Sequence, residues 1–146
     1  MTVNDTDTCL CPVAVTLSLI GGRHKALILW NLLDGTMRYS ELRRAVPAAT
    51  PKMLTQQLRE LEADGLVVRK VYPVVPPRVD YSLTPTGESI RPILTSMYRW
   101  GKDYLASRNL EVNCSMKPPA EDEAQAGGQD DEADVSAPTR KCCCGG

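Results

Sequence analysis

The sequence has little of what an enzyme active site requires. Its 146 residues include a single histidine. They contain no glycine-rich loop that would bind phosphate and no pair of carboxylates arranged for acid–base catalysis. No apolar run approaches the ~20 residues of a membrane span, and the first residues lack the basic-then-apolar order of a signal peptide. We therefore expect a soluble, cytoplasmic protein that is not an enzyme, needs no cofactor and does not bind a membrane.

The charges of the chain are divided sharply between two parts. Residues 1–110 contain 14 Lys+Arg and 10 Asp+Glu, a net charge of +4, whereas residues 111–146 contain 3 and 8, a net charge of −5. A basic body suits a polyanionic partner. The acidic part is too poor in apolar residues to form a core. We predict a folded domain over residues 9–108 and a disordered acidic tail with a cysteine-rich end over residues 109–146.

The segment from Thr50 to Gly65 has the pattern of a helix with two distinct faces. Thr50 is a suitable N-cap, Pro51 suits the first helical position, and Gly65 is a natural C-terminal stop. Leucines at helical spacing predict a buried stripe, and a second stripe contains only hydrogen-bonding or cationic side chains. The buried stripe is Leu54, Leu58 and Leu61, and the polar stripe is Lys52, Thr55, Gln56 and Arg59.

Two predicted strands follow this helix directly. Residues 66–72 and 79–83 read as a β-hairpin, joined by a proline-rich loop that ends in Arg78. A helix with a polar stripe of major-groove width beside such a hairpin is what a winged helix-turn-helix needs to bind DNA. The alternative is an ordinary amphipathic helix whose polar face is only solvated.

The remaining segments predict further helices on both sides of this unit. They are a short helix from Pro12 that ends at Gly21-Gly22, a strongly apolar helix over residues 23–33, a short helix over residues 41–45 with Ser40 as its N-cap, and a last helix from Pro85 that should kink or break near Pro92. The fold class is therefore mainly α with a small β-hairpin, a winged helix-turn-helix with an extra helix at each end.

The chain resembles the HxlR-type winged-helix transcription regulators, which are related to the MarR type. The resemblance covers about residues 9–106, and one departure is His24, where the family often has Trp; we expect this histidine at the surface or near DNA. The matching segments are Cys11-Pro12-Val13, Leu19-Ile20-Gly21-Gly22, Arg38-Tyr39-Ser40-Glu41-Leu42, residues 54–62, Asp64-Gly65-Leu66, the wing motif of residues 72–79, residues 81–87 and Trp100-Gly101.

The resemblance implies a homodimer that binds a pseudo-palindromic operator, with the first and last helices at the interface. The residues support this independently, because the last helix carries more large apolar side chains than a small core can absorb. The alternative is that this helix folds back over its own core. The candidate interface residues are Val13, Leu17, Met97, Trp100 and Tyr104.

Roles on DNA follow from side-chain chemistry. Gln56 can present its amide to adenine, and Arg59 can pair with guanine or a phosphate. The minor groove attracts guanidinium, which suits Arg78 at the wing. The candidates for phosphate contacts are Lys52, Thr55, Ser40 and Arg38.

The cysteines suggest a sensing chemistry, since thiols in the cytoplasm are usually reduced. Cys11 precedes the first helix, whose dipole favours a thiolate, and the resemblance implies that a cysteine here can sense oxidants or electrophiles such as quinones. Cys9 could resolve a sulfenic acid formed there or pair across the dimer. The alternative for Cys11 is a buried, inert thiol.

Two other functions stay open. Cys142, Cys143 and Cys144, with help from Cys114, could bind a soft metal or metalloid ion such as Cu(I), Zn or As(III). Such a site would make the chain a metal-responsive regulator. A protein-interaction module without DNA binding is the third possibility.

Overall fold

The computed structural model describes residues 11–112 and residue 118. The predicted sensing partner Cys9, the other cysteines Cys114 and Cys142–Cys144, and nearly all of the acidic tail lie outside the described residues. The domain limits at residues 9 and 108 therefore stay predictions. Within the described part, every helix and strand lies between Pro12 and Ser107.

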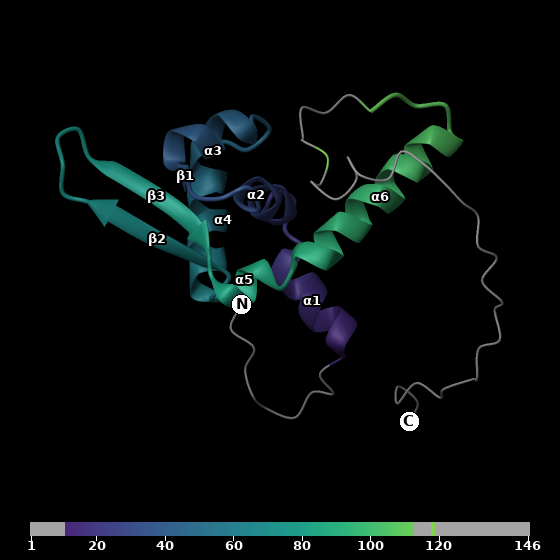
Figure 1. The fold of residues 1–146 in the computed structure, drawn as a ribbon, viewed down its shortest axis with the longest axis horizontal. Coiled ribbons are helices and arrows are strands. Elements are labelled where there is room, and N and C mark those ends of the chain that lie inside the picture. The colour runs from purple at the N-terminus through teal and green to yellow at the C-terminus, as the bar shows by residue number, and fades with distance from the viewer. Residues whose placement is uncertain (1–10, 113–117, 119–146) are drawn as a thin grey trace. The chain divides into compact units, whose positions relative to one another are not determined.

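The described chain is mainly helical, with one small antiparallel sheet (Figure 1). The strands lie in the order β1-β3-β2, and the predicted fold class is confirmed. No helix among the described residues is both long and apolar enough to span a membrane. The elements are α1 (Pro12–Ile20), α2 (Lys25–Leu32), β1 (Met37–Arg38), α3 (Tyr39–Ala45), α4 (Pro51–Ala63), β2 (Val67–Tyr72), β3 (Arg78–Leu83), α5 (Pro85–Glu88) and α6 (Arg91–Ser107).

The core lies where α2, α3 and α4 pack against one another and against the sheet. α2 is the predicted apolar helix, and Ile28 and Leu29 within it have no exposed surface. The leucine stripe of α4 is buried as predicted, with Leu54 and Leu61 fully enclosed. This packing holds α4 by its apolar face, so that its polar face is turned outward.

The ends of α4 are formed as the sequence predicts. The hydroxyl of Thr50 accepts a hydrogen bond from the backbone N–H of Met53 at 3.2 Å. At the other end Gly65 has a φ of +73°, a conformation that glycine adopts at little cost. The N–H of Leu66 then bonds to the carbonyl of Leu61 at 3.0 Å. The turn directs the chain into β2 without a further connecting segment.

One strand and one helix start differ from the sequence analysis. The predicted hairpin has a third strand, β1, whose Met37 and Arg38 pair with Tyr81 and Asp80 of β3. Two residues are too few to show an alternating pattern. The prediction that Ser40 caps α3 is wrong: the helix begins at Tyr39, because the strand leads into it directly. The N–H of Arg38, at the N-cap, instead donates to a carboxylate oxygen of Glu41 at 2.7 Å.

The last helical region is broken where the sequence predicts. α5 ends at Glu88 and α6 begins at Arg91, which places Pro92 in the first turn of α6. Proline is well tolerated there, because its missing N–H would have no partner in the helix. α5 is capped by Thr84, whose hydroxyl accepts from the N–H of Gly87 at 3.0 Å.

Candidate nucleic-acid interface

The outward face of α4 presents three of its four predicted DNA-contacting side chains to solvent. Lys52, Gln56 and Arg59 are exposed. The amide nitrogen of Gln56 donates to a carboxylate oxygen of Glu60, one turn further on, at 3.2 Å. Neither Lys52 nor Arg59 forms an ion pair within the described ranges, so both cations are available to an external anion.

Thr55 occupies a different position from its neighbours in the stripe. Its side chain is half-buried, and its hydroxyl donates to the carbonyl of Pro51 at 2.8 Å and lies 3.2 Å from the hydroxyl of Tyr39. Tyr39 begins α3, so this contact fixes the angle between α3 and α4. The structure thus gives Thr55 a role in holding the two helices together. Arg38 and Ser40, which flank Tyr39, are exposed.

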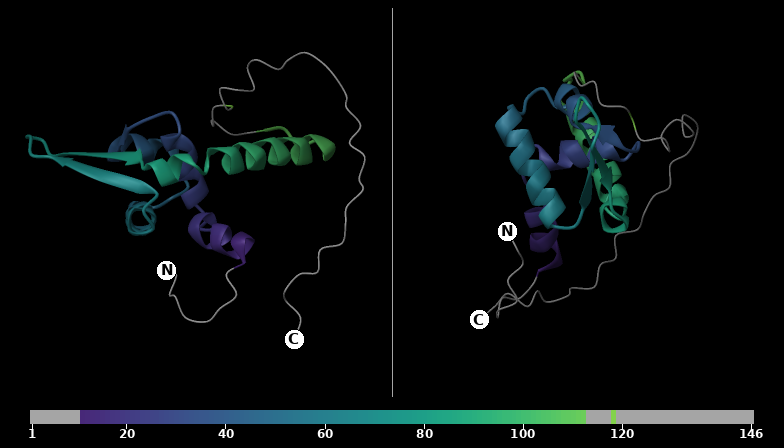
Figure 2. Two further views of the ribbon diagram at one scale, coloured as in Figure 1. Left: turned by 60° about the horizontal axis from the view of Figure 1, so that its bottom comes forward. Right: turned by 90° about the vertical axis from the view of Figure 1, so that its left-hand side faces the viewer.

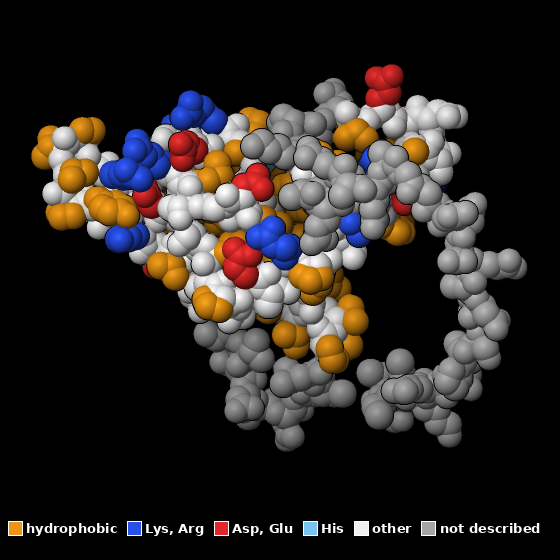
Figure 3. Space-filling model, in the orientation of Figure 1, with side chains coloured by type: hydrophobic (Ala, Val, Ile, Leu, Met, Phe, Trp, Pro, Cys, Tyr) orange, Lys and Arg blue, Asp and Glu red, His pale blue; other side chains and the backbone are white. Residues whose placement is uncertain are grey.

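The β2–β3 hairpin projects from the helical body and forms the wing (Figures 1 and 2). Its tip is apolar: Val75 is fully exposed and Val74 is 51% exposed. Figure 3 shows this orange tip at the left, followed by a group of blue cationic side chains nearer the body. A hollow of about 670 Å³ between the wing and the start of α3 is lined in part by Arg38, Ser40 and Arg78.

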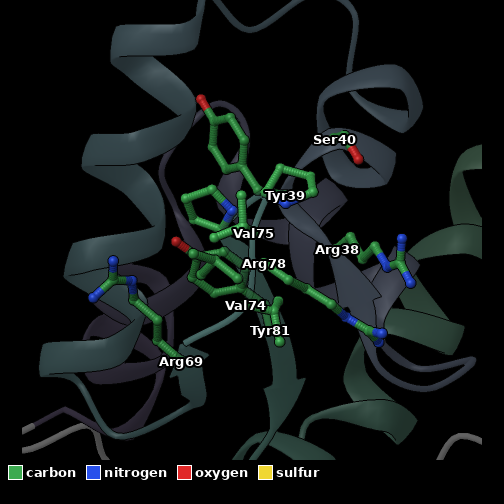
Figure 4. A pocket seen from close by; sticks show the side chains of 11 residues that line it. Arg38, Tyr39, Ser40, Arg69, Val74, Val75, Arg78 and Tyr81 are labelled. Carbon is green, nitrogen blue, oxygen red and sulfur yellow. The ribbon is translucent and has the colours of Figure 1, made fainter. Parts of the chain in front are cut away.

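Cationic side chains lie on both sides of the wing ribbon. Arg69 extends to one side and Arg38 and Arg78 to the other (Figure 4). The register agrees, because Arg69 lies opposite Tyr81, whereas Arg38 and Lys70 both lie opposite Asp80, and neighbouring residues of a strand point to opposite faces. Cations therefore lie on both faces of the ribbon.

Arg78 lies at the base of the wing loop, at the first position of β3, and its guanidinium is held by Asp80. The Nε–Oδ1, Nε–Oδ2 and Nη2–Oδ2 distances are 2.8, 3.1 and 2.6 Å. Its Cζ atom also lies 5.2 Å from the centre of the Tyr72 ring. The hydrogen bond from Arg78 lowers the pKa of Asp80, and Asp80 in turn raises the pKa of Arg78. Asp80 was not predicted from the sequence, although an acid two residues from Arg78 in a strand shares its face.

An ion pair with a buried lysine joins α2 to α4. The ammonium group of Lys25 lies 2.9 Å from Glu60 and 3.8 Å from Asp64. The side chain of Lys25 is only 7% exposed. The hydrogen bond from Lys25 lowers the pKa of Glu60. Helical spacing alone could not reveal this pair, because it joins residues 35 positions apart or more in the sequence.

The expectation that His24 lies at the surface is wrong. His24 is 3% exposed and precedes α2, where its carbonyl accepts from the N–H of Ile28 at 2.9 Å. Its Nδ1 atom is buried and has no hydrogen-bond partner among the described residues. The cause is that the chain turns inward after Gly22, so the position that follows Arg23 faces the core. A large aromatic side chain would be buried at the same place.

Cys11 is exposed and occupies the N-cap position of α1. Its carbonyl accepts from the N–H of Val15 at 3.0 Å. The alternative that Cys11 is buried is therefore wrong, whereas the reactivity of its thiol stays a prediction. In the described part of the chain, no three His, Cys, Asp or Glu side chains are grouped to hold a metal ion. The proposed metal ligands Cys142–Cys144 lie outside that part.

α1 and α6 both pack against α2 and leave large apolar side chains uncovered. α6 has two faces. One carries Leu94 and Tyr98 against α2, with the Tyr98 ring stacked on Trp30 at 5.1 Å. The other contains the predicted interface residues of α6, so the helix does more than cover its own core. The exposed fractions are 66% for Val13, 59% for Leu17, 49% for Met97, 69% for Trp100 and 43% for Tyr104.

A helical body with an outward-facing α4 and a projecting hairpin defines the winged helix-turn-helix class. The chain matches the HxlR-like helix-turn-helix family over residues 19–109 and belongs to that family. It is 48% identical over 109 residues to the HTH-type transcriptional regulator YkvN of Bacillus subtilis, covering 75% of this chain and 92% of the relative. A regulator of Methanothermobacter thermautotrophicus is 52% identical over 98 residues, covering 67% and 75%.

Solved structures show the same fold. The redox regulator HypR in its oxidised form is 50% identical and superposes with a TM-score of 0.61, covering 64% of this chain and 96% of that one. The reduced form of YodB from B. subtilis is 34% identical, with a TM-score of 0.57 and coverage of 65% and 94%. The protein is thus a DNA-binding transcriptional regulator and not an enzyme.

Proposed function

We propose that the protein is a homodimer that binds a pseudo-palindromic operator and loses this binding when Cys11 is oxidised or alkylated. The observation that carries the proposal is the outward polar face of α4, fixed by its buried leucines beside a wing with cations on both faces. Gln56 and Arg59 read bases in the major groove, because they project from the exposed part of that face. Lys52, Arg38 and Ser40 contact phosphates.

The second copy of the chain covers the apolar faces of α1 and α6. On α6 these side chains border a hollow of about 690 Å³ lined in part by Ile93, Met97 and Trp100. The rings of Trp100 and Tyr104 are stacked at 5.2 Å, and both side chains are exposed. An exposed patch of this kind favours a partner with the same chemistry. A two-fold axis through it places two copies of α4 on successive major grooves.

Cys11 is placed to control that arrangement. It is an exposed thiol at the start of α1, the helix that presents Val13 and Leu17 to the second copy. A group added to its sulfur changes the packing of α1 and rotates the two copies relative to each other. HypR is a redox regulator whose structure is known in oxidised and reduced forms, and YodB has been solved after treatment with diamide. These two structural neighbours support the proposal of a redox response in this chain.

Footprinting of the DNA upstream of the protein's own gene tests the function. We expect two protected half-sites whose centres lie about 10 base pairs, or a multiple of one helical turn, apart. Protection should weaken after treatment with diamide or a quinone. Uniform, salt-sensitive protection without half-sites would contradict sequence-specific binding.

A further inference from the structure

Asp80 is a nearly buried anion beneath a group of cations on one face of the wing. Its side chain is 3% exposed, whereas that of Arg78 is 42% exposed. Arg38 of β1 and Lys70 of β2 lie directly opposite Asp80 in the two neighbouring strands, so all these side chains share a face. A carboxylate at this position stabilises the wing, and its three short contacts to Arg78 also hold the guanidinium in one orientation.

The contacts leave only one edge of the Arg78 guanidinium for DNA. Asp80 accepts from Nε and Nη2, and Tyr72 lies beneath Cζ. A guanidinium is planar and presents its donors as a fixed fork. Asp80 occupies the Nε edge of the guanidinium, and the Tyr72 ring covers one of its two faces. The edge that carries Nη1 remains for an outside acceptor. Arg78 therefore meets DNA in a preset orientation.

We propose that Asp80 is a positioning residue that sets the direction of the Arg78 guanidinium and thereby contributes to discrimination between the operator and random DNA. The inference rests on the proposed function, since it concerns the wing of the same interface. Random DNA is bound mainly through charge, for which the orientation of a cation matters little. In a specific complex the protein occupies one fixed position along the operator. A guanidinium that is already oriented for that position loses less conformational entropy when it binds.

The test compares the affinity for the footprinted operator with that for random DNA in the parent and in two variants. Asp80→Asn keeps the shape of the side chain but removes its charge. Arg78→Lys keeps the cation but removes the planar fork. The control is Asp103→Asn, which makes the same charge change at an exposed site on α6. Thermal unfolding of each variant shows whether the fold is retained.

Both wing variants should lose at least about threefold in the ratio of operator to random affinity. Asp80→Asn should bind random DNA as well as the parent or better, because the wing loses a negative charge. The control should leave the ratio unchanged.

Four other results overturn the inference. If Asp80→Asn strengthens binding to both DNAs equally, Asp80 only neutralises charge. If both affinities fall equally together with the melting temperature, its role is structural. If the parent discriminates and both variants keep the ratio, the orientation of Arg78 is irrelevant and only this inference fails. A parent without any preferred site would remove the proposed function and this inference with it.

Discussion

At the scale of residues, we propose that two side chains of α4 recognise bases. Gln56 and Arg59 are exposed and lie three positions apart, so they project from the same side of the helix. The hydrogen bond from Gln56 to Glu60 at 3.2 Å turns the amide along the helix before DNA is bound. Its second amide hydrogen and its carbonyl oxygen remain for adenine.

We expect Gln56→Ala and Arg59→Ala to weaken operator binding by about 1–3 kcal/mol each if they read bases, with little effect on random DNA. Lys52→Ala is the matched comparison, because a phosphate contact supports both kinds of DNA. It should weaken both affinities and reduce the salt slope by about one unit. Titration of labelled operator at several salt concentrations measures all three. Equal effects of Gln56→Ala on the two DNAs would show that this side chain reads no base.

The sequence indicated these α4 residues correctly as an exposed set because their spacing matches the helical period. It could not reveal the hydroxyl contact that holds Thr55 to Tyr39, the carboxylate that holds Arg78, or the burial of His24. Each of these depends on which segments meet in space. Spacing along one helix contains no information about contacts from another element.

At the scale of elements, the ion pair between the buried Lys25 and Glu60 links α2 to α4. Lys25 has two carboxylates within reach, and one of them, on Asp64, is 9% exposed. Removal of the cation leaves these groups facing each other without compensation. The pair therefore stabilises the position of α4 on the body.

This pair predicts how stability depends on pH. The folded-state pKa of Glu60 is lowered by Lys25, so its contribution is present at neutral pH and is lost as the pH falls below about 4, the ordinary range of carboxyl groups. Lys25→Met should reduce the free energy of unfolding by about 1–3 kcal/mol at pH 7. The Lys25→Met variant should also lose less stability than the parent between pH 6 and pH 3.

Thermal or urea unfolding across that pH range measures the effect. Lys102→Met, at an exposed site on α6, is the control and should change little. A Lys25→Met variant that matches the parent at every pH would show that the pair adds nothing to stability.

Most element boundaries could be predicted because caps and breakers mark them. Thr50, Gly65 and Pro92 each lie where the sequence placed a start, a stop or a break. β1 could not be predicted, because its two residues become a strand only by pairing with β3. The start of α3 shifted for the same reason, since Arg38 serves both elements.

At the scale of the whole molecule, the uncovered faces of α1 and α6 predict a dimer. Trp100→Asp places a charge in the centre of that surface, and burial of an unpaired charge is costly. We expect the variant to sediment as a monomer or to aggregate at micromolar concentration, whereas the parent forms a dimer. Ala106→Asp, on another face of α6, is the control and should remain dimeric. A monomeric parent would reject both the interface and the palindromic operator.

The proposed redox response belongs to the same scale, because it requires one sulfur atom to change the spacing of two copies of α4. The sequence indicated Cys11 through its place before Pro12, and the structure shows that the thiol is exposed at the start of α1. In this proposal, a rotation of a few degrees at α1 would move the two recognition helices out of register with successive major grooves. Two half-sites amplify the loss, because both must fit at once.

The most direct measurement is the operator affinity of the parent and of Cys11→Ser, each before and after diamide or a quinone. Serine keeps the size of the side chain and removes the reactive sulfur. We predict that the parent changes affinity at least several-fold and regains it with a thiol reductant after diamide, whereas Cys11→Ser stays constant. If Cys11→Ser responds as the parent does, Cys11 is not the sensor.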